Sequence, residues 1–318
     1  MQSSTKHRLS RESLLAMAGR AFPGVGVGDI RELSEGYFNA AYALTLSDGR
    51  EVILKVAPQP GARIMSYEKN IMAAEVEAMR LVRAHTEAPV AEVLFYDAAC
   101  QICPSPYFFM TKLPGDSLNA LLEAKADVDV PAVYEQTGRY NRAINSITGD
   151  VFGLLGQPEL CSPDWYTAFR AMLNLAVQDA RALSIDMTID PEDMLALLER
   201  DRPLFQQVTT PRLVHWDLWD GNLFVQDGRL SGIIDLERSM WADVLMEAGF
   251  RSHNQDADFL RGYGVAAFTP EERRRILWYD AYAFSQVCLE RDYRQYPDSF
   301  FYDWSTEGLR KTLAQLQG

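Results

Sequence analysis

The sequence predicts an α+β chain with two lobes, and three observations lead to this prediction. Short alternating apolar runs separated by turn signals fill residues 1–112, which is typical of an antiparallel sheet. Long stretches with helical spacing of apolar residues fill most of residues 113–318. The length of 318 residues fits two domains of roughly 150 residues each. The pattern changes at Leu113-Pro114-Gly115, where we expect a hinge between a smaller amino-terminal lobe and a larger, mostly helical lobe.

The amino-terminal lobe should hold an antiparallel sheet and two helices. Ser10 can cap the first helix. The expected buried stripe of that helix is Leu14, Leu15, Met17, Ala18 and Ala21. Asp48-Gly49 between two alternating runs predicts a hairpin. The expected elements, in chain order, are a helix over 11–21, strands over 30–33, 40–46 and 51–56, a helix over 67–84, and strands over 90–96 and 107–111.

The carboxy-terminal lobe should be mostly helical, with one β-rich island. Helical spacing predicts helices over 130–147, 164–184, 191–207 and 270–295. The island covers residues 213–236 and contains a second Asp-Gly turn, at Asp227-Gly228. This island holds the polar residues on which the functional prediction depends.

Composition and charge narrow the classes of function. Hydrophobic residues make up 47% and charged residues 24% of the chain, which excludes a disordered or fibrous protein. The formal net charge of −13 argues against nucleic acid or an anionic membrane as the main partner, and it would attract a cationic ligand. Apolar runs fall short of the roughly 18 residues that a membrane span needs, and the stretch from Leu14 to Ala18 is too short for a secretory signal. We therefore expect a cytoplasmic protein.

Cys100 and Cys103 form a CxxC pair, which in other proteins can bind metal or exchange disulfides. A zinc site would need a second such pair or a nearby histidine, and the sequence offers neither. Pro104 and Pro106 follow the pair, as in a turn. We therefore favour a structural role for these cysteines.

The candidate site lies in the β-rich island, within the stretch from His215 to Glu237. Short apolar runs flank its polar clusters, so Asp217, Asn222 and Asp235 should lie at strand ends and face one site. Two carboxylates and an amide provide hard oxygen ligands, which suit Mg²⁺ bound to nucleotide phosphates. A carboxylate beside the metal can accept a proton from an attacking hydroxyl.

These residues resemble those of the aminoglycoside phosphotransferases and their small-molecule kinase relatives, which share the protein-kinase-like fold. Asp217, Asn222 and Asp235 follow in the order of the kinase signature, five and thirteen positions apart (222 − 217 and 235 − 222). Ile-Asp-x-Glu at 234–237 is closer to this family than to the protein kinases. The resemblance implies Mg²⁺- and ATP-dependent phosphoryl transfer to a hydroxyl. It makes Asp217 the catalytic base and assigns the metal to Asn222 and Asp235.

The resemblance also assigns the nucleotide site. Lys55, at the end of a hydrophobic strand, would contact the α- and β-phosphates. Glu75 shares a helix face with Met79 and Val82 and would pair with Lys55; Glu77 is the less suitable partner.

Two chain segments would complete the nucleotide site. Gly36 and Asn39 belong to the turn that would cover the nucleotide, and Thr111 and Leu113 belong to the hinge that would present backbone groups to the base. Because backbone groups do the recognition at the hinge, GTP is an alternative to ATP.

The sequence departs from the family pattern at several positions. Trp216 stands where the family commonly has glycine, and the sequence does not show whether Trp216 and Trp219 wall the pocket or pack beneath it. His215 should brace the loop structurally, as in the family. Glu237 could support a second metal ion or hydrogen-bond the loop. Glu247 stands where the family has a structural aspartate.

The acceptor and the exact activity stay open at this stage. The expected acceptor region is rich in acidic and aromatic residues, which suits a cationic ligand, although a solvated acidic face over an aromatic core explains them equally well. Arg291 and Arg294 lie in the same region and oppose a purely cationic acceptor. The residues concerned are Asp150, Asp164, Glu290, Asp292, Asp298, Asp303 and Glu307, with Trp165, Tyr166, Tyr293, Tyr296, Phe300, Phe301, Tyr302 and Trp304.

We expect a kinase for an aminoglycoside-like or other antibiotic. One alternative is a metabolite kinase of the same fold, for choline, homoserine or a sugar. Another, from a different class, is a pseudokinase that binds nucleotide and acts on a protein partner without transferring phosphate.

Overall fold

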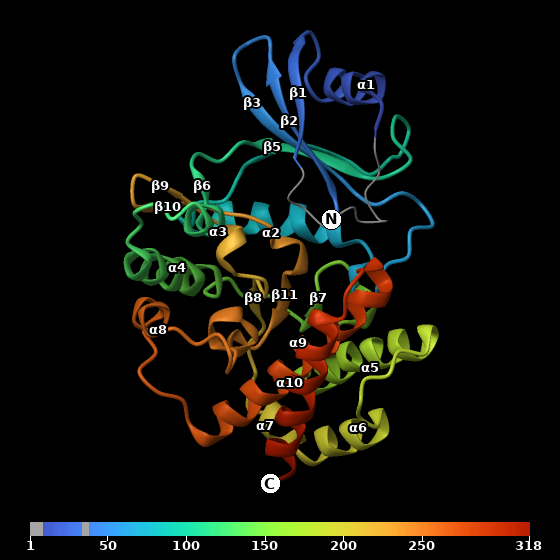
Figure 1. Ribbon diagram of the computed structural model, residues 1–318, viewed down its shortest axis with the longest axis vertical. Coiled ribbons are helices and arrows are strands. Elements are labelled where there is room, and N and C mark those ends of the chain that lie inside the picture. Colours follow the sequence, from blue (N-terminus) through green and yellow to red (C-terminus); the bar gives the residue numbers. More distant parts are fainter. Residues whose placement is uncertain (1–8, 34–37) are drawn as a thin grey trace.

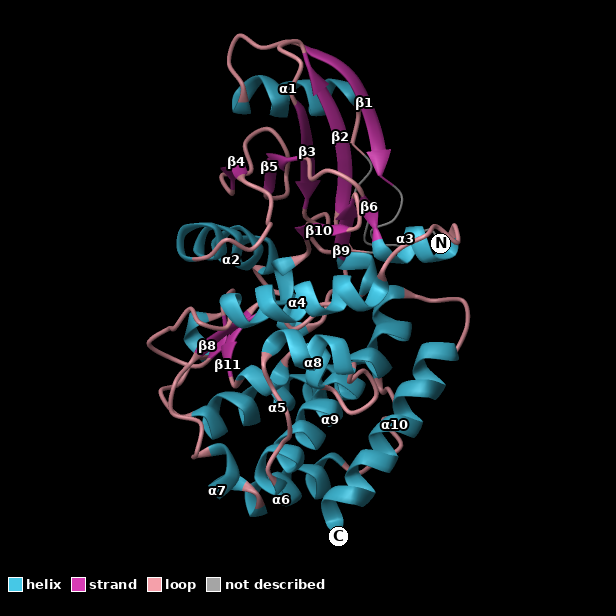
Figure 2. Ribbon diagram, turned by 90° about the vertical axis from the view of Figure 1, so that its left-hand side faces the viewer, coloured by secondary structure: helices cyan, strands magenta, loops and turns pink. Residues whose placement is uncertain are grey.

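The computed structural model describes residues 9–33 and 38–318. A five-stranded sheet lies at one end of the molecule and most of the helices gather at the other, where β7, β11 and β8 form a small sheet; β10, β9 and β6 form a third sheet between them (Figure 1). The view turned by 90° shows the same division (Figure 2). The predicted fold class, a sheet-containing lobe joined to a larger helical lobe, is therefore confirmed.

The elements are as follows. The helices are α1 (Arg11–Ala21), α2 (Ile71–His85), α3 (Leu118–Glu123), α4 (Val130–Ile144), α5 (Trp165–Leu183), α6 (Pro191–Arg200), α7 (Arg202–Phe205), α8 (Ala257–Tyr263), α9 (Pro270–Arg294) and α10 (Phe300–Gln317). The strands are β1 (Val27–Leu33), β2 (Ala40–Leu46), β3 (Glu51–Val56), β4 (Val93–Asp97), β5 (Tyr107–Thr111), β6 (Asp116–Ser117), β7 (Gly153–Leu154), β8 (Arg212–Val214), β9 (Leu223–Gln226), β10 (Arg229–Ile233) and β11 (Met240–Ala242). Three 3₁₀ turns border the site: η1 (Ser66–Glu68), η3 (Asp220–Asn222) and η4 (Leu236–Arg238).

The upper sheet is antiparallel, with strand order β1-β2-β3-β5-β4. The β2–β3 hairpin turns at Asp48-Gly49, as predicted, and Gly49 has a φ of +88°, which glycine adopts without strain. β3 lies in the middle of this sheet, so Lys55 near its end is 6% exposed. The central strand thereby carries a charged side chain toward the lower lobe.

The first helix confirms the predicted cap but corrects its buried stripe. Ser10 Oγ accepts a hydrogen bond from the backbone N–H of Ser13, at 3.1 Å. Leu14, Met17 and Ala18 are buried, whereas Leu15 is 39% exposed. The prediction was wrong for Leu15 because the buried face of this helix is narrow and follows the three-to-four-residue spacing of 14, 17 and 18.

Two predicted helices are interrupted in the structure, and the helix expected over 130–147 ends at Ile144. The helix expected over 67–84 is a short turn, η1, followed by α2 from Ile71, because Asn70 has a left-handed backbone with a φ of +56°. The helix expected over 191–207 is split into α6 and α7 at Asp201. Pro203, at the start of α7, lacks the N–H that a continuous helix would need. Buried Asp201 also accepts hydrogen bonds from Arg274 and Trp278, which fixes this corner against α9.

The sequence prediction left out three helices, α3, α8 and α10. Of these, α10 packs along α9, and the pair runs the length of the lower lobe (Figure 1). Over the described ranges, no helix is both long and apolar enough to pass through a membrane. The lobe boundary between residues 112 and 113 and the cytoplasmic location stay predictions.

An aromatic cluster forms the core of the lower lobe. Phe169 of α5 is fully buried, and its ring stacks on Phe205 at 5.1 Å between centroids. The ring also contacts Trp165, Tyr279 and Tyr282 at 5.4–5.9 Å. Because the two tyrosines belong to α9, this cluster fixes α9 against α5 and so sets one wall of the lower lobe.

Replacement of Phe169 by alanine should lower the free energy of unfolding by about 3–5 kcal/mol, because the lost ring leaves a cavity. Urea unfolding followed by circular dichroism measures this change. Phe300→Ala is the matched control, since that ring is 67% exposed and its loss should change stability by less than about 0.5 kcal/mol. Equal losses for the two variants would contradict the assignment of the core.

Candidate active site

Three chain segments meet at a charge cluster between the lobes, in which Lys55 and Glu75 are buried and Asp235 is partly exposed. Lys55 Nζ of β3 lies 2.7 Å from Glu75 Oε1 of α2 and 2.7 Å from Asp235 Oδ1, which follows β10. The structure thus brings together three residues that the sequence predicted for one site. Glu77 points to solvent, so Glu75 is the partner of Lys55, as expected.

The charges of this cluster support one another. Burial alone would lower the pKa of Lys55, but the carboxylates of Asp235 and Glu75 outweigh burial and raise it. Burial favours the neutral form of Asp235, yet the ammonium of Lys55 lowers the pKa of Asp235 below its ordinary value. Lys55 and Asp235 are therefore both charged at neutral pH, and they form an ion pair that links the upper sheet to the lower lobe.

The loop between β8 and β9 is held by its own polar groups. His215 Nε2 lies 2.9 Å from the carbonyl oxygen of Ile234, and His215 Nδ1 accepts from the N–H of Asp217 at 3.3 Å. Asn222 Nδ2 donates to the carbonyl oxygen of Asp217 at 2.8 Å. His215 therefore braces the loop, as predicted. The backbone of Asp217 is fixed from both sides, while its side chain stays partly exposed.

Glu247, which follows β11 in the chain, holds the backbone of this loop by hydrogen bonds. It is fully buried, and its two carboxylate oxygens accept the backbone N–H groups of His215 and Trp216, each at 2.9 Å. The side-chain amides of Asn141 and Asn145 donate to the same carboxylate. A single carboxylate thus ties the loop to α4.

The structure answers the question that Trp216 raised. Trp216 has a φ of +71°, a left-handed backbone that glycine adopts without strain, which accounts for the glycine that the resemblance led us to expect there. Its ring is 3% exposed and packs edge-on against Tyr282, whereas Trp219 is 49% exposed. Trp216 therefore packs beneath the loop, and Trp219 faces solvent.

The predicted nucleotide-loop residues are described only in part. Gly36 lies outside the described residues. Asn39 is buried, and its Nδ2 donates to Glu237 Oε2 at 2.7 Å, so Glu237 hydrogen-bonds the predicted nucleotide turn and not the loop that carries Asp217. Burial raises the pKa of Glu237 to about 8, even though Lys55 opposes this shift.

The hinge residues lie where β5 leaves the upper sheet. The backbone N–H of Thr111 donates to the carbonyl oxygen of Glu92 at 3.0 Å, so this N–H is already used within the sheet. Leu113 packs against β10, where an added Cβ at Gly232 would lie 2.6 Å from Leu113 Cδ1. This contact ties the hinge to the lower lobe.

The residues proposed for Mg²⁺ fit that ion. The amide nitrogen of Asn222 is used by the loop, which leaves its oxygen as a ligand. The side chain of Asp235 is 40% exposed, and only its Oδ1 contacts Lys55. Two hard oxygen donors in a site shared with solvent match the way Mg²⁺ is held, with water and phosphate supplying the other ligands.

Sequence reasoning missed Arg238, which lies next to Asp217. Its Nε is 3.8 Å from Asp217 Oδ2, and its Nη2 is 3.1 Å from Glu290 Oε1 of α9. Its guanidinium lies over the rings of Tyr67 and Trp216. Arg238 belongs to no sequence motif, so only the three-dimensional structure identifies it.

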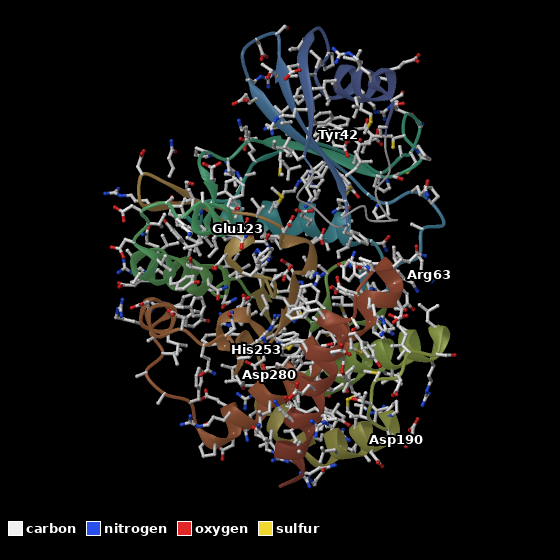
Figure 3. The ribbon with its side chains drawn as sticks, in the orientation of Figure 1. Tyr42, Arg63, Glu123, Asp190, His253 and Asp280 are labelled. Carbon is white, nitrogen blue, oxygen red and sulfur yellow. The ribbon has the colours of Figure 1, made fainter. Side chains whose placement is uncertain are left out.

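The acidic and aromatic residues of the expected acceptor region separate in space. Trp165, Tyr166 and Tyr293 are buried, Asp164 caps α5, and Glu307 pairs with Lys311. Among the acidic members, Glu290 is the one that contacts Arg238. In Figure 3, His253 and Asp280 lie side by side in the middle of the lower lobe, and His253 Nδ1 is 3.9 Å from Asp280 Oδ1. Over the described ranges, no group of three or more His, Cys, Asp and Glu side chains could hold a metal; Cys100 and Cys103 are free thiols.

The fold and the cluster around Lys55 define a phosphotransferase of the kinase-like class. The family model of the "Phosphotransferase enzyme family" matches residues 29–279, and the chain belongs to this family. Over 69 residues the chain is 39% identical to an aminoglycoside 3'-phosphotransferase of Enterococcus faecalis, and the match covers 21% of this chain and 25% of that protein. A subtelomeric hrmA-associated cluster protein of Aspergillus fumigatus is 30% identical over 128 residues, or 40% of this chain. The chain spans about a quarter of the length of these curated relatives (24% and 25%).

Solved structures share the fold over nearly the whole chain. A putative fructosamine-3-kinase of Thermobifida fusca superimposes with a TM-score of 0.68 at 16% identity, over 96% of this chain and all of that one. A thermostable mutant of aminoglycoside phosphotransferase APH(4)-Ia, in complex with ADP and hygromycin B, gives a TM-score of 0.64 at 18% identity. That match covers 95% of this chain and 98% of the other. At these identities the likeness shows the fold.

Asp280 and His253 should make the stability of the protein depend on pH. Burial raises the pKa of Asp280 to about 6, so between about pH 4 and 6 the folded protein keeps a proton there that the unfolded chain has lost. The stabilisation is present below about pH 4 and is lost as the pH rises through 6. As the pH rises from about 4 to 7, the free energy of unfolding of Asp280→Asn should increase by about 3 kcal/mol relative to that of the wild type, at roughly 1.4 kcal/mol per pKa unit.

Urea unfolding of both proteins between pH 4 and 7 measures this difference. Burial lowers the pKa of His253 to about 4, an opposite contribution that both proteins share and that the comparison removes. A difference that does not change with pH would contradict the raised pKa of Asp280.

Proposed function

We propose that this protein is an ATP-dependent kinase that transfers the γ-phosphoryl group to a hydroxyl of a small molecule with the help of Mg²⁺. The observation that supports this most is the contact of Lys55 with both Glu75 and Asp235, beside a loop that presents Asp217 and Asn222. Such a cluster provides one cation and several oxygen donors within a narrow site. That combination suits a metal–nucleotide complex.

Each part of the nucleotide has a proposed partner. Lys55, held by Glu75, would contact the α- and β-phosphates, and the turn containing Gly36 and Asn39 would cover them. The carbonyl of Thr111 and the backbone of Leu113 would meet the base. Since these are backbone groups, GTP is the alternative nucleotide.

Asp217 is the proposed catalytic base. Its side chain would accept the proton of the acceptor hydroxyl while the hydroxyl oxygen bonds to the γ-phosphorus. The bond from that phosphorus to the β-bridging oxygen breaks, and ADP leaves. Mg²⁺, held by Asn222 and Asp235, would neutralise charge on the phosphates. The chain itself contributes positioning and a fixed electrostatic environment.

The acceptor class has several candidates. Relatives of the same fold were solved with hygromycin B and with streptomycin and ATP, and another is a putative fructosamine-3-kinase. An aminoglycoside-like or other antibiotic is therefore one proposed acceptor, and a metabolite of the choline, homoserine or sugar type is the other. A nucleotide-binding pseudokinase is the alternative without transfer.

Asp217→Ala should lower turnover by about 10²- to 10⁴-fold, the usual contribution of a general base, while ATP affinity stays nearly unchanged. ADP release is measured against aminoglycosides, other hydroxylated antibiotics, amino alcohols and sugars, and ATP affinity by calorimetry. Loss of nucleotide binding in the variant would contradict the role of Asp217. Nucleotide binding by the wild type without transfer to any acceptor would favour the pseudokinase.

Asp235→Ala should weaken binding of Mg-ATP at least tenfold, because the metal loses a carboxylate ligand. Removal of Mg²⁺ with EDTA should weaken ATP binding to the wild type by a similar factor and have little further effect on the variant. Asp193→Ala, at an exposed position of α6, is the control and should bind Mg-ATP like the wild type. If Asp235→Ala bound Mg-ATP normally, the proposed metal site would be wrong.

A further inference from the structure

A small cavity lies next to Trp216 and Arg238, and Arg238 in turn lies close to Asp217. It is lined by residues of α2, β7, η1, η4 and α9 and by Trp216 of the loop, and its volume is about 10 Å³, room for one water-sized group. The lining includes Tyr67, Trp216, Arg238, Ser239 and Tyr282. No part of the proposed nucleotide chemistry uses the polar groups of these side chains.

Four buried polar atoms of this lining have no hydrogen-bond partner within the described part of the chain. They are Tyr67 Oη, Trp216 Nε1, Arg238 Nε and Ser239 Oγ. An unpaired buried polar group costs about 1–3 kcal/mol, so four around one cavity indicate a missing ligand group. Trp216 and Arg238 can only donate hydrogen bonds, and burial raises the pKa of Tyr67, which keeps its proton. The cavity therefore calls for an atom that accepts hydrogen bonds.

The carboxylates around the cavity already have partners. Glu290 contacts Arg238 at 3.1 Å and Arg294 at 3.8 Å. Glu68 contacts Arg294 at 2.5 Å, and Glu237 accepts from Asn39. A cationic ligand would have to displace one of these internal partners, which costs the desolvation of both charges.

The aromatic faces around the cavity are occupied as well. The guanidinium of Arg238 lies 5.5 Å from the ring centre of Tyr67 and 5.2 Å from that of Trp216. Arg251 covers Trp216 at 4.6 Å and donates to its carbonyl oxygen at 2.6 Å. The rings that could bind an ammonium group by a cation–π interaction therefore hold the protein's own guanidinium groups.

Arg238 also lies close to Asp217, the proposed base. Arg238 Nε lies 3.8 Å from Asp217 Oδ2, which is too long for a hydrogen bond. An oxygen atom of a ligand near Asp217 can accept from Arg238 Nε while a neighbouring hydroxyl reaches the carboxylate. This arrangement places a cation next to the proposed base.

Building on the proposed kinase function, we propose that this cavity binds an oxygen-bearing group of a neutral or anionic acceptor and that Arg238 determines this specificity. The group is a single oxygen atom, from a hydroxyl or from one arm of a carboxylate, that accepts hydrogen bonds from Arg238 and Trp216. The acceptor carries it close to the hydroxyl that is phosphorylated. Polycationic aminoglycosides are then poor acceptors for this chain, in spite of its fold.

The test uses one sugar ring with three charges: glucuronate, glucose and glucosamine, with kanamycin as a polycationic reference. ADP release is measured for each sugar at equal concentration. The extent to which each sugar suppresses the slow hydrolysis of ATP by water is measured in parallel. In the wild type, ADP release should be faster with glucuronate and glucose than with glucosamine, by about tenfold between the extremes. This ratio corresponds to roughly 1.4 kcal/mol, the contribution of one charge-assisted hydrogen bond. Arg238→Gln should reduce that ratio to near one, and Arg238→Lys should retain part of it.

Arg202→Gln is the matched control, because Arg202 also lies over a tyrosine ring and contacts a glutamate, but in α7, far from the cavity in sequence and element. This variant should keep the wild-type order. A preference for glucosamine or kanamycin, a ratio unchanged in Arg238→Gln, or no response to any sugar would each overturn the proposal.

Calorimetry with Mg-ATP, done first on the wild type, distinguishes a failure of the proposed kinase function from a failure of the proposed acceptor pocket. If nucleotide does not bind, the proposed kinase function fails, and the acceptor pocket fails with it. If nucleotide binds and the order of acceptors is wrong, only the assignment of the cavity fails.

Discussion

The structure depends on one buried ionic contact, in which Lys55 bridges Glu75 and Asp235 at 2.7 Å each. These residues come from the central strand of the upper sheet, the helix beneath it and the segment after β10. A buried charge is costly unless it is paired, so this contact fixes the three segments relative to one another. It also explains why the two lobes meet at this place: each contributes charges that the other must neutralise.

A second constraint acts on the backbone of the loop that carries Asp217. Trp216 has a left-handed backbone, which costs about 1–3 kcal/mol for a residue other than glycine. Glu247 offsets this cost by accepting two successive backbone N–H groups, and the packing of Trp216 against Tyr282 adds to it. The bulky loop is therefore compatible with the family fold because its strain is relieved from below.

The charge of the whole chain and the charge beside Asp217 have opposite signs. The formal net charge is −13, yet the groups nearest to Asp217 include Arg238 and Arg251. Long-range attraction to a cation and short-range recognition are thus separate properties, because screening and pairing decide which charges a bound ligand meets. The acceptor cannot be inferred from composition alone.

The sequence by itself determined the fold class, because alternating and helical periodicities are local. The fixed spacing of Asp217, Asn222 and Asp235 predicted one site for these three, and the family resemblance added Lys55 and Glu75, which the structure brings into one cluster with Asp235. It also indicated that His215 braces the loop. It missed the break at Asp201, the exposure of Leu15 and the role of Arg238. Those depend on which faces pack together across long stretches of chain. Only the tertiary structure could decide them, since contacts such as Arg238 with Glu290 join residues whose spacing carries no periodic signal.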